Sequence, residues 1–276
     1  MSNFIFHWGC DPVLFKIGGI EIRYYSLSWA LCFYLSFIIF KKLVMKRNWS
    51  VQECDNALMI MIYSVALGAR LGHCLFYDFE YFSLHPLEII LPLKISSSGI
   101  EFQPFSGLAS HGAILGIFVG IFIFYRKYKR HPLDLLDHIA VVAPLGGGFI
   151  RFGNFFNSEI LGSPTNGNYG IIFTNVDSIP RHPAQLYEAF GYFLISFIVY
   201  KCYLRFKDTT DNGFISGITL TLCFMLRFVI EFFKQSQNAY DNGILNSIGI
   251  NLGQILSIPM IILGITLIIY CKKTKN

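Results

Sequence analysis

Residues 144–162 read P-L-G-G-G-F-I-R-F-G-N-F-F-N-S-E-I-L-G and place charged and amide side chains inside an apolar pattern. The stretch follows an apolar run and is typical of the outer half of a membrane-spanning helix. It nevertheless carries Arg151, Asn154, Asn157 and Glu159. A charged group at membrane depth costs from about 2.5 to above ~10 kcal/mol unless it is paired or faces a wet cavity. We therefore expect Arg151 to hold an anionic partner.

The composition around this stretch is that of a membrane protein. The chain has 276 residues, of which 54% are apolar and only 14% charged, and its mean hydropathy is +0.51. These values predict an all-α polytopic membrane protein with residues 1–276 in one integral membrane domain. The seven cysteines are scattered without a C-x-x-C pair, so we interpret them as small apolar side chains and expect no metal site.

Seven membrane spans are expected, because a helical span needs about 20 mainly apolar residues. They lie at 24–45, 54–77, 108–125, 133–156, 184–204, 214–234 and 250–270. Clusters of Lys and Arg follow the odd-numbered spans, for example at 41–47 and 126–130. The positive-inside rule then predicts an N-terminus outside and a C-terminus in the cytoplasm. Residues 1–23 lack the pattern of a cleaved signal, so the first span is expected to be retained.

The segments between spans differ in kind. Residues 3–22 are aromatic and mixed, which suits a segment lying at the membrane interface. Residues 78–107 contain L-E-I-I-L-P-L-K-I and are expected to supply short strands or an interfacial piece. Residues 157–183 are rich in Gly and Pro and are expected to be loop, and 235–249 are polar. Residues 78–107, 157–183 and 235–249 are predicted to lie on the outer side of the membrane.

Three arginines fall at similar depth in the spans that run outward. At 1.5 Å per residue, Arg70, Arg151 and Arg227 lie within roughly 8 Å of the same depth. Glu231 follows Arg227 by one helical turn, so the two are expected to pair. Guanidinium groups match phosphate oxygens, which favours a phosphate between these side chains. The alternative is structural, with each arginine paired to helix-end carbonyls or a local carboxylate.

Two outward span ends carry groups suited to chemistry. Tyr25 lies in R-Y-Y-S, and His111 lies in G-L-A-S-H-G with glycines close on both sides. A histidine titrates near neutral pH and suits proton transfer. An interfacial tyrosine is more often an anchor, and a lone histidine near a span end is more often structural. Asn154 and Asn157 also have a structural alternative, as hydrogen-bonding groups between helices.

Several motifs stand in order along the chain. The longest is G-F-I-R-F-G-N-F-F-N-S-E-I-L-G at 148–162, and R-H-P-A-Q-L-Y-E stands at 181–188. They are accompanied by L-G-A-R-L-G at 67–72, the His111–Gly112 pair and R-F-V-I-E-F-F at 227–233. Together these motifs resemble one family, the prolipoprotein diacylglyceryl transferases of bacterial inner membranes. The resemblance covers nearly the whole chain.

The resemblance implies a reaction and a place for it. An enzyme of this family transfers the diacylglyceryl group of phosphatidylglycerol to the lipobox cysteine thiol of a preprolipoprotein, and glycerol phosphate leaves. Membrane lipids and preprolipoprotein signal peptides are the implied partners, with no cofactor, metal or nucleic acid. The implied location is the bacterial inner membrane, with a small periplasmic head and the active site toward the outer leaflet.

The resemblance also implies roles for individual residues. His111, Arg151, Arg227 and Tyr25 are implied as catalytic, His111 as a candidate base. The implied substrate-binding residues are Arg70, Arg151, Asn154, Asn157, Glu159, Gly162, Arg227 and Glu231. The sequence departs from the family pattern at His73, Ala113, Cys223 and Lys234. Cys223 stands where an aromatic residue is familiar, which removes any hydroxyl role there.

Two other classes of function compete with this interpretation. A transporter or binding protein for an anionic substrate also uses arginines inside the membrane. However, no pair of interrupted spans occupies corresponding positions in two halves of the chain. A rhomboid-type serine protease needs a span serine and a histidine on a later span. The sixth and seventh predicted spans contain no histidine.

Overall fold

The computed structural model describes residues 4–18, 20–96, 99–102, 107–235 and 250–272. The chain forms two compact units, and each is described by itself. The first unit comprises Met1–Leu43 and Leu136–Asn276, and the second comprises Val44–Leu135.

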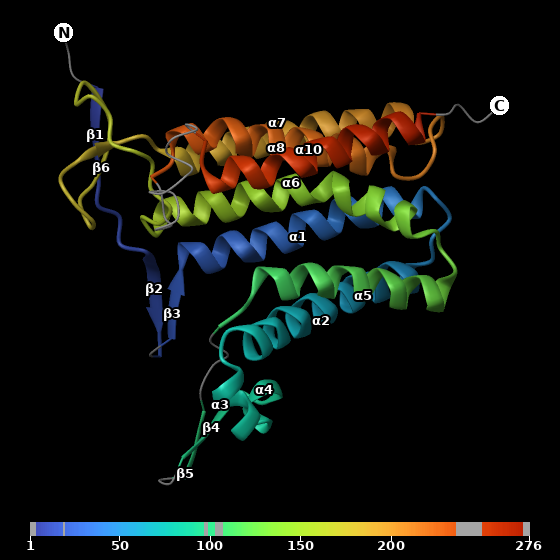
Figure 1. The fold of residues 1–276 in the computed structure, drawn as a ribbon, viewed down its shortest axis with the longest axis horizontal. Helices are drawn as coiled ribbons and strands as arrows, with labels where there is room; N and C mark the ends of the chain where they lie inside the picture. The colour runs from blue at the N-terminus through green and yellow to red at the C-terminus, as the bar shows by residue number, and fades with distance from the viewer. Residues whose placement is uncertain (1–3, 19, 97–98, 103–106, 236–249, 273–276) are drawn as a thin grey trace. The chain divides into compact units, whose positions relative to one another are not determined.

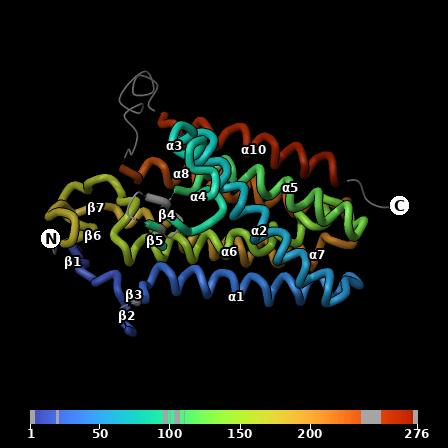
Figure 2. The backbone as a smooth tube through the Cα atoms, turned by 90° about the horizontal axis from the view of Figure 1, so that it is seen from below, coloured from blue at the N-terminus to red at the C-terminus, as the bar shows by residue number. Residues whose placement is uncertain are grey.

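Five long helices dominate the first unit (Figures 1 and 2). They are α1 (Tyr24–Met45), α6 (Pro132–Phe156), α7 (Ala184–Phe206), α8 (Phe214–Ile230) and α10 (Leu252–Cys271), with a 3-10 turn η1 (Glu231–Phe233) after α8. Glycines on α6 make room for side chains of the neighbouring helices. A Cβ added at Gly147 would lie 3.3 Å from the ring of Tyr192 on α7, and one at Gly146 would lie 3.1 Å from the sulfur of Cys32 on α1.

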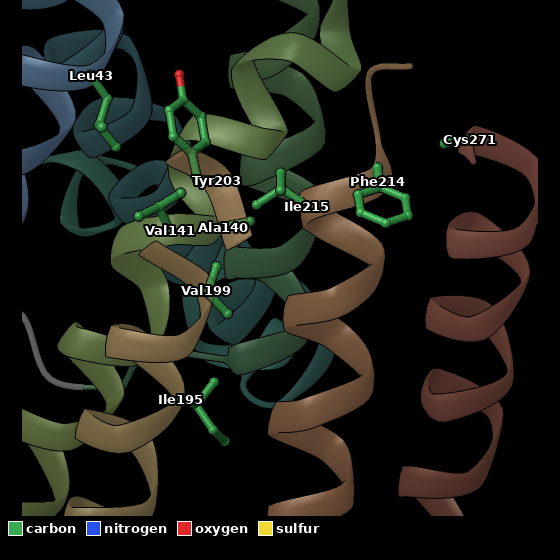
Figure 3. Packing of buried hydrophobic residues seen from close by; sticks show 9 residues of the cluster. All are labelled: Leu43, Ala140, Val141, Ile195, Val199, Tyr203, Phe214, Ile215 and Cys271. Atoms are coloured by element: carbon green, nitrogen blue, oxygen red, sulfur yellow. The ribbon is translucent and has the colours of Figure 1, made fainter. Parts of the chain in front are cut away.

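A buried apolar cluster holds these helices together at one end (Figure 3). Helix α7 contributes Ile195, Val199 and Tyr203, which follow one another by four residues and therefore share a helix face. The remaining members come from the other four helices: Leu43, Ala140, Val141, Phe214, Ile215 and Cys271. This packing sets the mutual positions of the helices whose other ends carry the polar residues.

The first unit also contains strands that the sequence did not predict. Strand β1 (Phe4–Trp8) pairs in parallel with β6 (Tyr169–Phe173), and β6 pairs with β7 (Pro180–Arg181). Strands β2 (Val13–Ile17) and β3 (Ile20–Arg23) form a hairpin. The loop prediction for 157–183 is therefore wrong where β6 and β7 lie, whereas the interfacial prediction for 3–22 stays a prediction. Strands of five residues or fewer are too short to show a reliable period, and β1 finds its partner far along the chain.

The second unit is built on a close helix pair. Helix α2 (Val51–Phe76) begins with a capping box between Ser50 and Glu53, and α5 (Ser110–Tyr128) packs along it. A Cβ at Gly72 would lie 2.7 Å from the Cα of Gly112, so both positions need a small residue for this approach.

The segment between these two helices holds short elements. They are α3 (Phe79–Leu84), α4 (Leu87–Ile90), β4 (Leu93–Ser96) and β5 (Gly99–Phe102). The hairpin of β4 and β5 confirms the expectation of short strands in this segment.

Six helices in the described part of the chain are long and apolar enough to cross a membrane. They correspond to six of the seven predicted spans, and they make the chain a mostly helical, multi-pass membrane protein. The other predicted span, 108–125, forms α5, which is not among the six. Polar and charged residues at both ends of α5, from His111 to Lys127, lower its mean hydropathy. The predicted outer segment 235–249 lies outside the described residues except for Gln235.

Candidate functional site

The end of α6 folds back on itself and gathers polar side chains around Arg151. Ser158 and Ile160 have φ of +53° and +54°, a left-handed backbone that reverses the chain around Glu159. The Asn154 side-chain nitrogen donates to Glu159 Oε2 at 3.0 Å, and Asn157 donates to Oε1 at 3.2 Å. Arg151 Nη1 donates in turn to Asn154 Oδ1 at 3.3 Å. The structure thus brings these four predicted residues together.

Arg151 is also joined to α7 and to the turn after α8 by a chain of charges. Its Nε lies 2.7 Å from Glu188 Oε2, and Glu188 Oε1 accepts a hydrogen bond from Lys234 Nζ at 2.9 Å. Lys234 lies 3.5 Å from Glu231 Oε2, an ion-pair distance without hydrogen-bond geometry. The Glu188 side chain is only 1% exposed. A buried carboxylate needs paired cations, and Glu188 has two.

Arg227 lies near this chain of charges without joining it. It is half-buried on α8, and it makes no ion pair or hydrogen bond with any residue that the structure describes. It lies near Tyr192 together with Arg151 and Glu188, close enough for all three charges to act on that hydroxyl. We call Arg151, Glu188, Arg227, Glu231 and Lys234 the arginine cluster.

The predicted Arg227–Glu231 pair is absent from the described structure, and Glu231 faces Lys234 instead. The backbone spacing itself is kept, because Glu231 caps α8 and its amide still donates to Arg227 O. The Glu231 side chain instead lies toward Lys234, three residues on and past the 3-10 turn η1. A short spacing along a helix therefore did not decide which cation this carboxylate meets.

A short backbone ladder fixes Lys234 against the α6 end. Gly162 forms a β-bridge with Lys234. On either side of it, the Ser163 amide donates to Phe233 O at 2.8 Å and the Gln235 amide donates to Leu161 O at 3.1 Å. A Cβ at Gly162 would overlap the carbonyl oxygen of His182, so only glycine fits there. The structure therefore gives the predicted Gly162 a supporting position.

A buried arginine strengthens the same ladder from outside the membrane spans. Arg181 Nη2 donates to Asp177 Oδ2 at 2.6 Å, and Nη1 donates to Gln235 Oε1 at 2.9 Å. The Arg181 guanidinium, together with the Ile179 backbone N–H, holds the pKa of the Asp177 carboxyl below its usual range. Arg181 thus connects the loop after α6 to the residue that follows Lys234.

Tyr25 packs on α6 at Gly153. A Cβ at Gly153 would lie 2.7 Å from the Tyr25 ring, so this close approach also requires glycine. The ring meets Trp29 edge to face, with centroids 6.3 Å apart. The structure therefore places Tyr25 against Gly153, and since residues two apart on a helix do not share a face, this contact is not on the Arg151 side of α6.

Two predicted site residues belong to the second unit. Arg70 donates to the backbone oxygens of Ile89 at 3.2 Å and Glu88 at 2.8 Å, and its guanidinium lies 4.7 Å from the Phe82 ring centre. These contacts match the structural alternative of helix-end carbonyls. His111 lies in the first turn of α5 with an exposed side chain.

The arrangement in the first unit suits an anionic ligand. The arginine cluster holds three cations against two carboxylates, and Arg227 is the cation without a described partner. Arg227 can therefore receive an anion with less loss of existing contacts than Arg151 or Lys234. Sequence reasoning missed the central role of Glu188 and Lys234, although Glu188 ends the motif R-H-P-A-Q-L-Y-E.

Comparison with known proteins adds a further finding. A family model described as "Prolipoprotein diacylglyceryl transferase" matches residues 12–270. The chain is similar to a phosphatidylglycerol–prolipoprotein diacylglyceryl transferase of Bacteroides fragilis, with 38% identity over 279 residues, covering 100% of this chain and 99% of that protein. Proteins of the same name from Tolumonas auensis and Rickettsia akari are 38% and 36% identical and cover 97% and 94% of this chain, and 98% and 95% of their own lengths.

Proposed function

The chain belongs to the prolipoprotein diacylglyceryl transferase family, and from that premise we propose the reaction and the roles of its residues. The protein transfers the diacylglyceryl group of phosphatidylglycerol to the lipobox cysteine thiol of a preprolipoprotein. The cysteine sulfur forms a thioether with the glycerol carbon, the C–O bond to the phosphate breaks, and glycerol phosphate leaves. The thiol proton is released to a base. This is the first step of lipoprotein maturation.

The arginine cluster is the observation that supports this proposal most directly. When the C–O bond breaks, the phosphate of the leaving group gains a second negative charge. Cations placed where charge develops lower the barrier, and guanidinium groups fit phosphate oxygens with two parallel hydrogen bonds. Arg227 is half-buried and has no described partner, so it is positioned to engage the phosphate. Arg151 is already oriented by Glu188 at 2.7 Å.

Asn154, Asn157, Glu159 and Gly162 support these cations. Their hydrogen bonds and the bridge to Lys234 hold the end of α6 in place. Because Glu159 accepts from both amides, its carboxylate orients Asn154 toward Arg151. Glu231 acts through Lys234. These groups set the site geometry before the lipid arrives, which lowers the reorganisation needed for reaction.

His111 is the proposed base for the thiol. Only the thiolate is a good nucleophile, and an ordinary cysteine is mostly protonated at neutral pH. A histidine side chain can take that proton at the same pH. The proposal for His111 rests on the family motif, as does the essential role proposed for Tyr25. The proposal that Arg70 binds substrate also rests on the family motif alone.

The proposed orientation follows from charge placement. Lys and Arg cluster after α1, α5 and α7, which favours a cytoplasmic location for those ends. The arginine cluster then faces the outer leaflet of the inner membrane, where a secreted lipobox cysteine is accessible. Seven spans and a periplasmic head containing the strands complete this topology.

The direct test uses the purified full-length protein in detergent or nanodiscs. It is incubated with phosphatidylglycerol and a lipobox peptide, and we expect glycerol phosphate release together with a mass gain on the peptide cysteine. A peptide with serine in place of that cysteine is the matched control. Lipid movement across liposomes without either product would instead support the transporter alternative.

A further inference from the structure

A groove between α1, α6 and α7 is not used by the proposed reaction. Its volume is about 370 Å³, within the range of about 300–1,000 Å³ for pockets that hold small molecules. Ile38, Ile39 and Lys42 of α1 line one wall, and Phe193, Phe197 and Tyr200 of α7 line the other. These helices lie alongside one another in Figure 2.

The groove has a continuous apolar wall at helical spacing. On α7, the lining residues follow the pattern i, i+3, i+4 and i+7, with Ser196 between Phe193 and Phe197. They occupy a different face from Ile195 and Val199, which pack in the buried cluster. The stripe from Phe193 to Tyr200 extends about 10 Å along the helix axis, or roughly two thirds of one leaflet of hydrocarbon. Phe197 is 59% exposed, so this wall faces outward from the protein.

Positive charge gathers at one end of the groove. Lys42 lines it directly, and Lys201 follows Tyr200 on the neighbouring helix. The ammonium group of Lys201 lies 5.5 Å from the Phe197 ring centre. The groove lining contains no acidic residue. An apolar slot with cations at one end complements a molecule that has a hydrocarbon chain and an anionic head.

From this complementarity we infer that the groove binds an anionic phospholipid. One acyl chain lies against Ile38 and Phe197, and the phosphate contacts Lys42 and Lys201. Basic pockets between transmembrane helices on the cytoplasmic side are a known way to hold anionic lipid headgroups. In the proposed orientation, the bound lipid belongs to the inner leaflet.

The lysine end of this groove is separate from the arginine cluster along the same helices. Tyr200 follows Glu188 by twelve residues on α7, and Val141 of the lining precedes Arg151 by ten residues on α6. At 1.5 Å per residue, these separations are about 18 Å and 15 Å. A lipid with its phosphate at Lys42 therefore occupies a different place from one presenting its phosphate to Arg227.

Photo-crosslinking locates the lipid and tests its headgroup. The full-length protein in nanodiscs receives a phosphatidylglycerol with a diazirine in one acyl chain, and the labelled peptides are identified by mass spectrometry. No peptide acceptor is added, so the probe is not consumed by transfer. We expect label on residues 38–42 and 193–200. Phosphatidylcholine and a free fatty acid with the same photoreactive chain are the parallel probes, and both should label this groove several-fold less.

Three variants separate the groove from general surface charge. Lys42→Gln should reduce groove labelling by phosphatidylglycerol several-fold, whereas Lys46→Gln, which removes a lysine outside the lining, should not. Ser196→Trp should fill the groove and abolish labelling by all three probes. Transfer to a lipobox peptide should remain at the wild-type rate in Lys42→Gln, which shows that the variant is folded.

Several outcomes would overturn the inference. Equal labelling by phosphatidylcholine would mean that the lysines do not recognise an anion, and stronger labelling by the fatty acid would assign the groove to a carboxylate ligand. If Lys42→Gln and Lys46→Gln reduced groove labelling equally, the reduction would come from the general surface potential and not from a contact in the groove. These outcomes do not bear on the proposed transferase function, because label near the arginine cluster and product formation are measured separately.

Discussion

Buried ion pairs lie at both ends of α6, α7 and α8. At only one end are all the hydrogen-bonding groups of the pair used. At the end away from Arg151, Asp137 and Lys207 meet at 2.8 Å with side chains 0% and 4% exposed. Asp137 also accepts from the amides of Gly213 at 3.0 Å and Ser216 at 2.9 Å, and from the Ser216 hydroxyl at 2.7 Å. Both of its oxygens are therefore occupied, and it ties the start of α8 to α6.

The arginine cluster at the other end leaves groups unused. Arg227 has no partner among the described residues, and Glu231 Oε2 is buried without a hydrogen bond. Buried polar groups in a structural network are normally satisfied, because each unpaired group costs free energy. The difference is consistent with a structural role for the Asp137 pair and with the ligand-binding role that we propose for the arginine cluster.

Breaking the Asp137 pair should give the largest effect on stability. Asp137→Ala removes the carboxylate that neutralises the buried Lys207 ammonium and the acceptor for the start of α8. We expect the free energy of unfolding to fall by about 3–5 kcal/mol, measured by denaturant unfolding in a fixed detergent. Asp137→Leu with Lys207→Met removes both charges and should recover only part of the loss, because the Gly213 and Ser216 amides still lack their acceptor. Lys272→Met, an exposed change, is the control.

Substituting Arg151 should instead affect activity more than stability. Arg151→Lys keeps the charge but loses the planar group that contacts both Glu188 and Asn154. We expect transfer to fall by about 10²–10³-fold, nearly as far as in Arg151→Ala, as for removal of one group that stabilises developing charge.

The control for this variant is Arg205→Lys, near the other end of α7, which should keep wild-type transfer. A normal rate for Arg151→Lys would show that charge alone is enough. If Arg151→Ala instead lost as much stability as Asp137→Ala, the contrast between the two ends would fail.

A double-mutant cycle should identify the partner of Glu231. The 3.5 Å contact predicts coupling between Glu231 and Lys234. For Glu231→Gln and Lys234→Met we expect an interaction energy of about 0.5–3 kcal/mol in transfer rate. The matched cycle of Glu231→Gln with Arg227→Gln should show a smaller coupling. A larger coupling of Glu231 with Arg227 than with Lys234 would favour the Arg227–Glu231 pair expected from sequence spacing.

The membrane spans could be predicted because charged residues mark where their apolar runs begin and end. Helix α1 occupies Tyr24–Met45, matching the predicted range, since Arg23 precedes its apolar run and the basic residues of 41–47 mark its other end. Strands β1 and β6 could not be predicted in the same way. Each has only five residues, and their pairing joins Phe4 to Tyr169 across most of the chain.

The site could be predicted where its residues are close in sequence. Arg151, Asn154 and Glu159 meet around the end of a single helix, so their spacing contains the information. Glu188 and Lys234 come from other segments and meet Arg151 only through packing, which no local pattern encodes. The Arg227–Glu231 prediction failed although the two residues keep helical spacing, because the Glu231 side chain lies toward Lys234 instead.

The Asp177–Arg181 pair outside the spans should give the smallest effect, and its dependence on pH has a definite sign. Arg181 lowers the pKa of Asp177 in the folded protein, whereas an unfolded aspartate titrates near about 3.9. The pair therefore stabilises the fold above that value, and its contribution is lost as pH falls through the lower folded pKa. The Asp177 side chain is 27% exposed, and screening by water keeps the expected contribution below about 1 kcal/mol. Asp177→Asn should lower the unfolding midpoint slightly at pH 7 and match the wild type once the pH is well below 3.9. Asp78→Asn, at an exposed position of the second unit, should show no such convergence. A constant difference between Asp177→Asn and wild type at every pH would assign the effect to packing of the loop, and the ion pair would then contribute nothing to holding the ladder at Lys234.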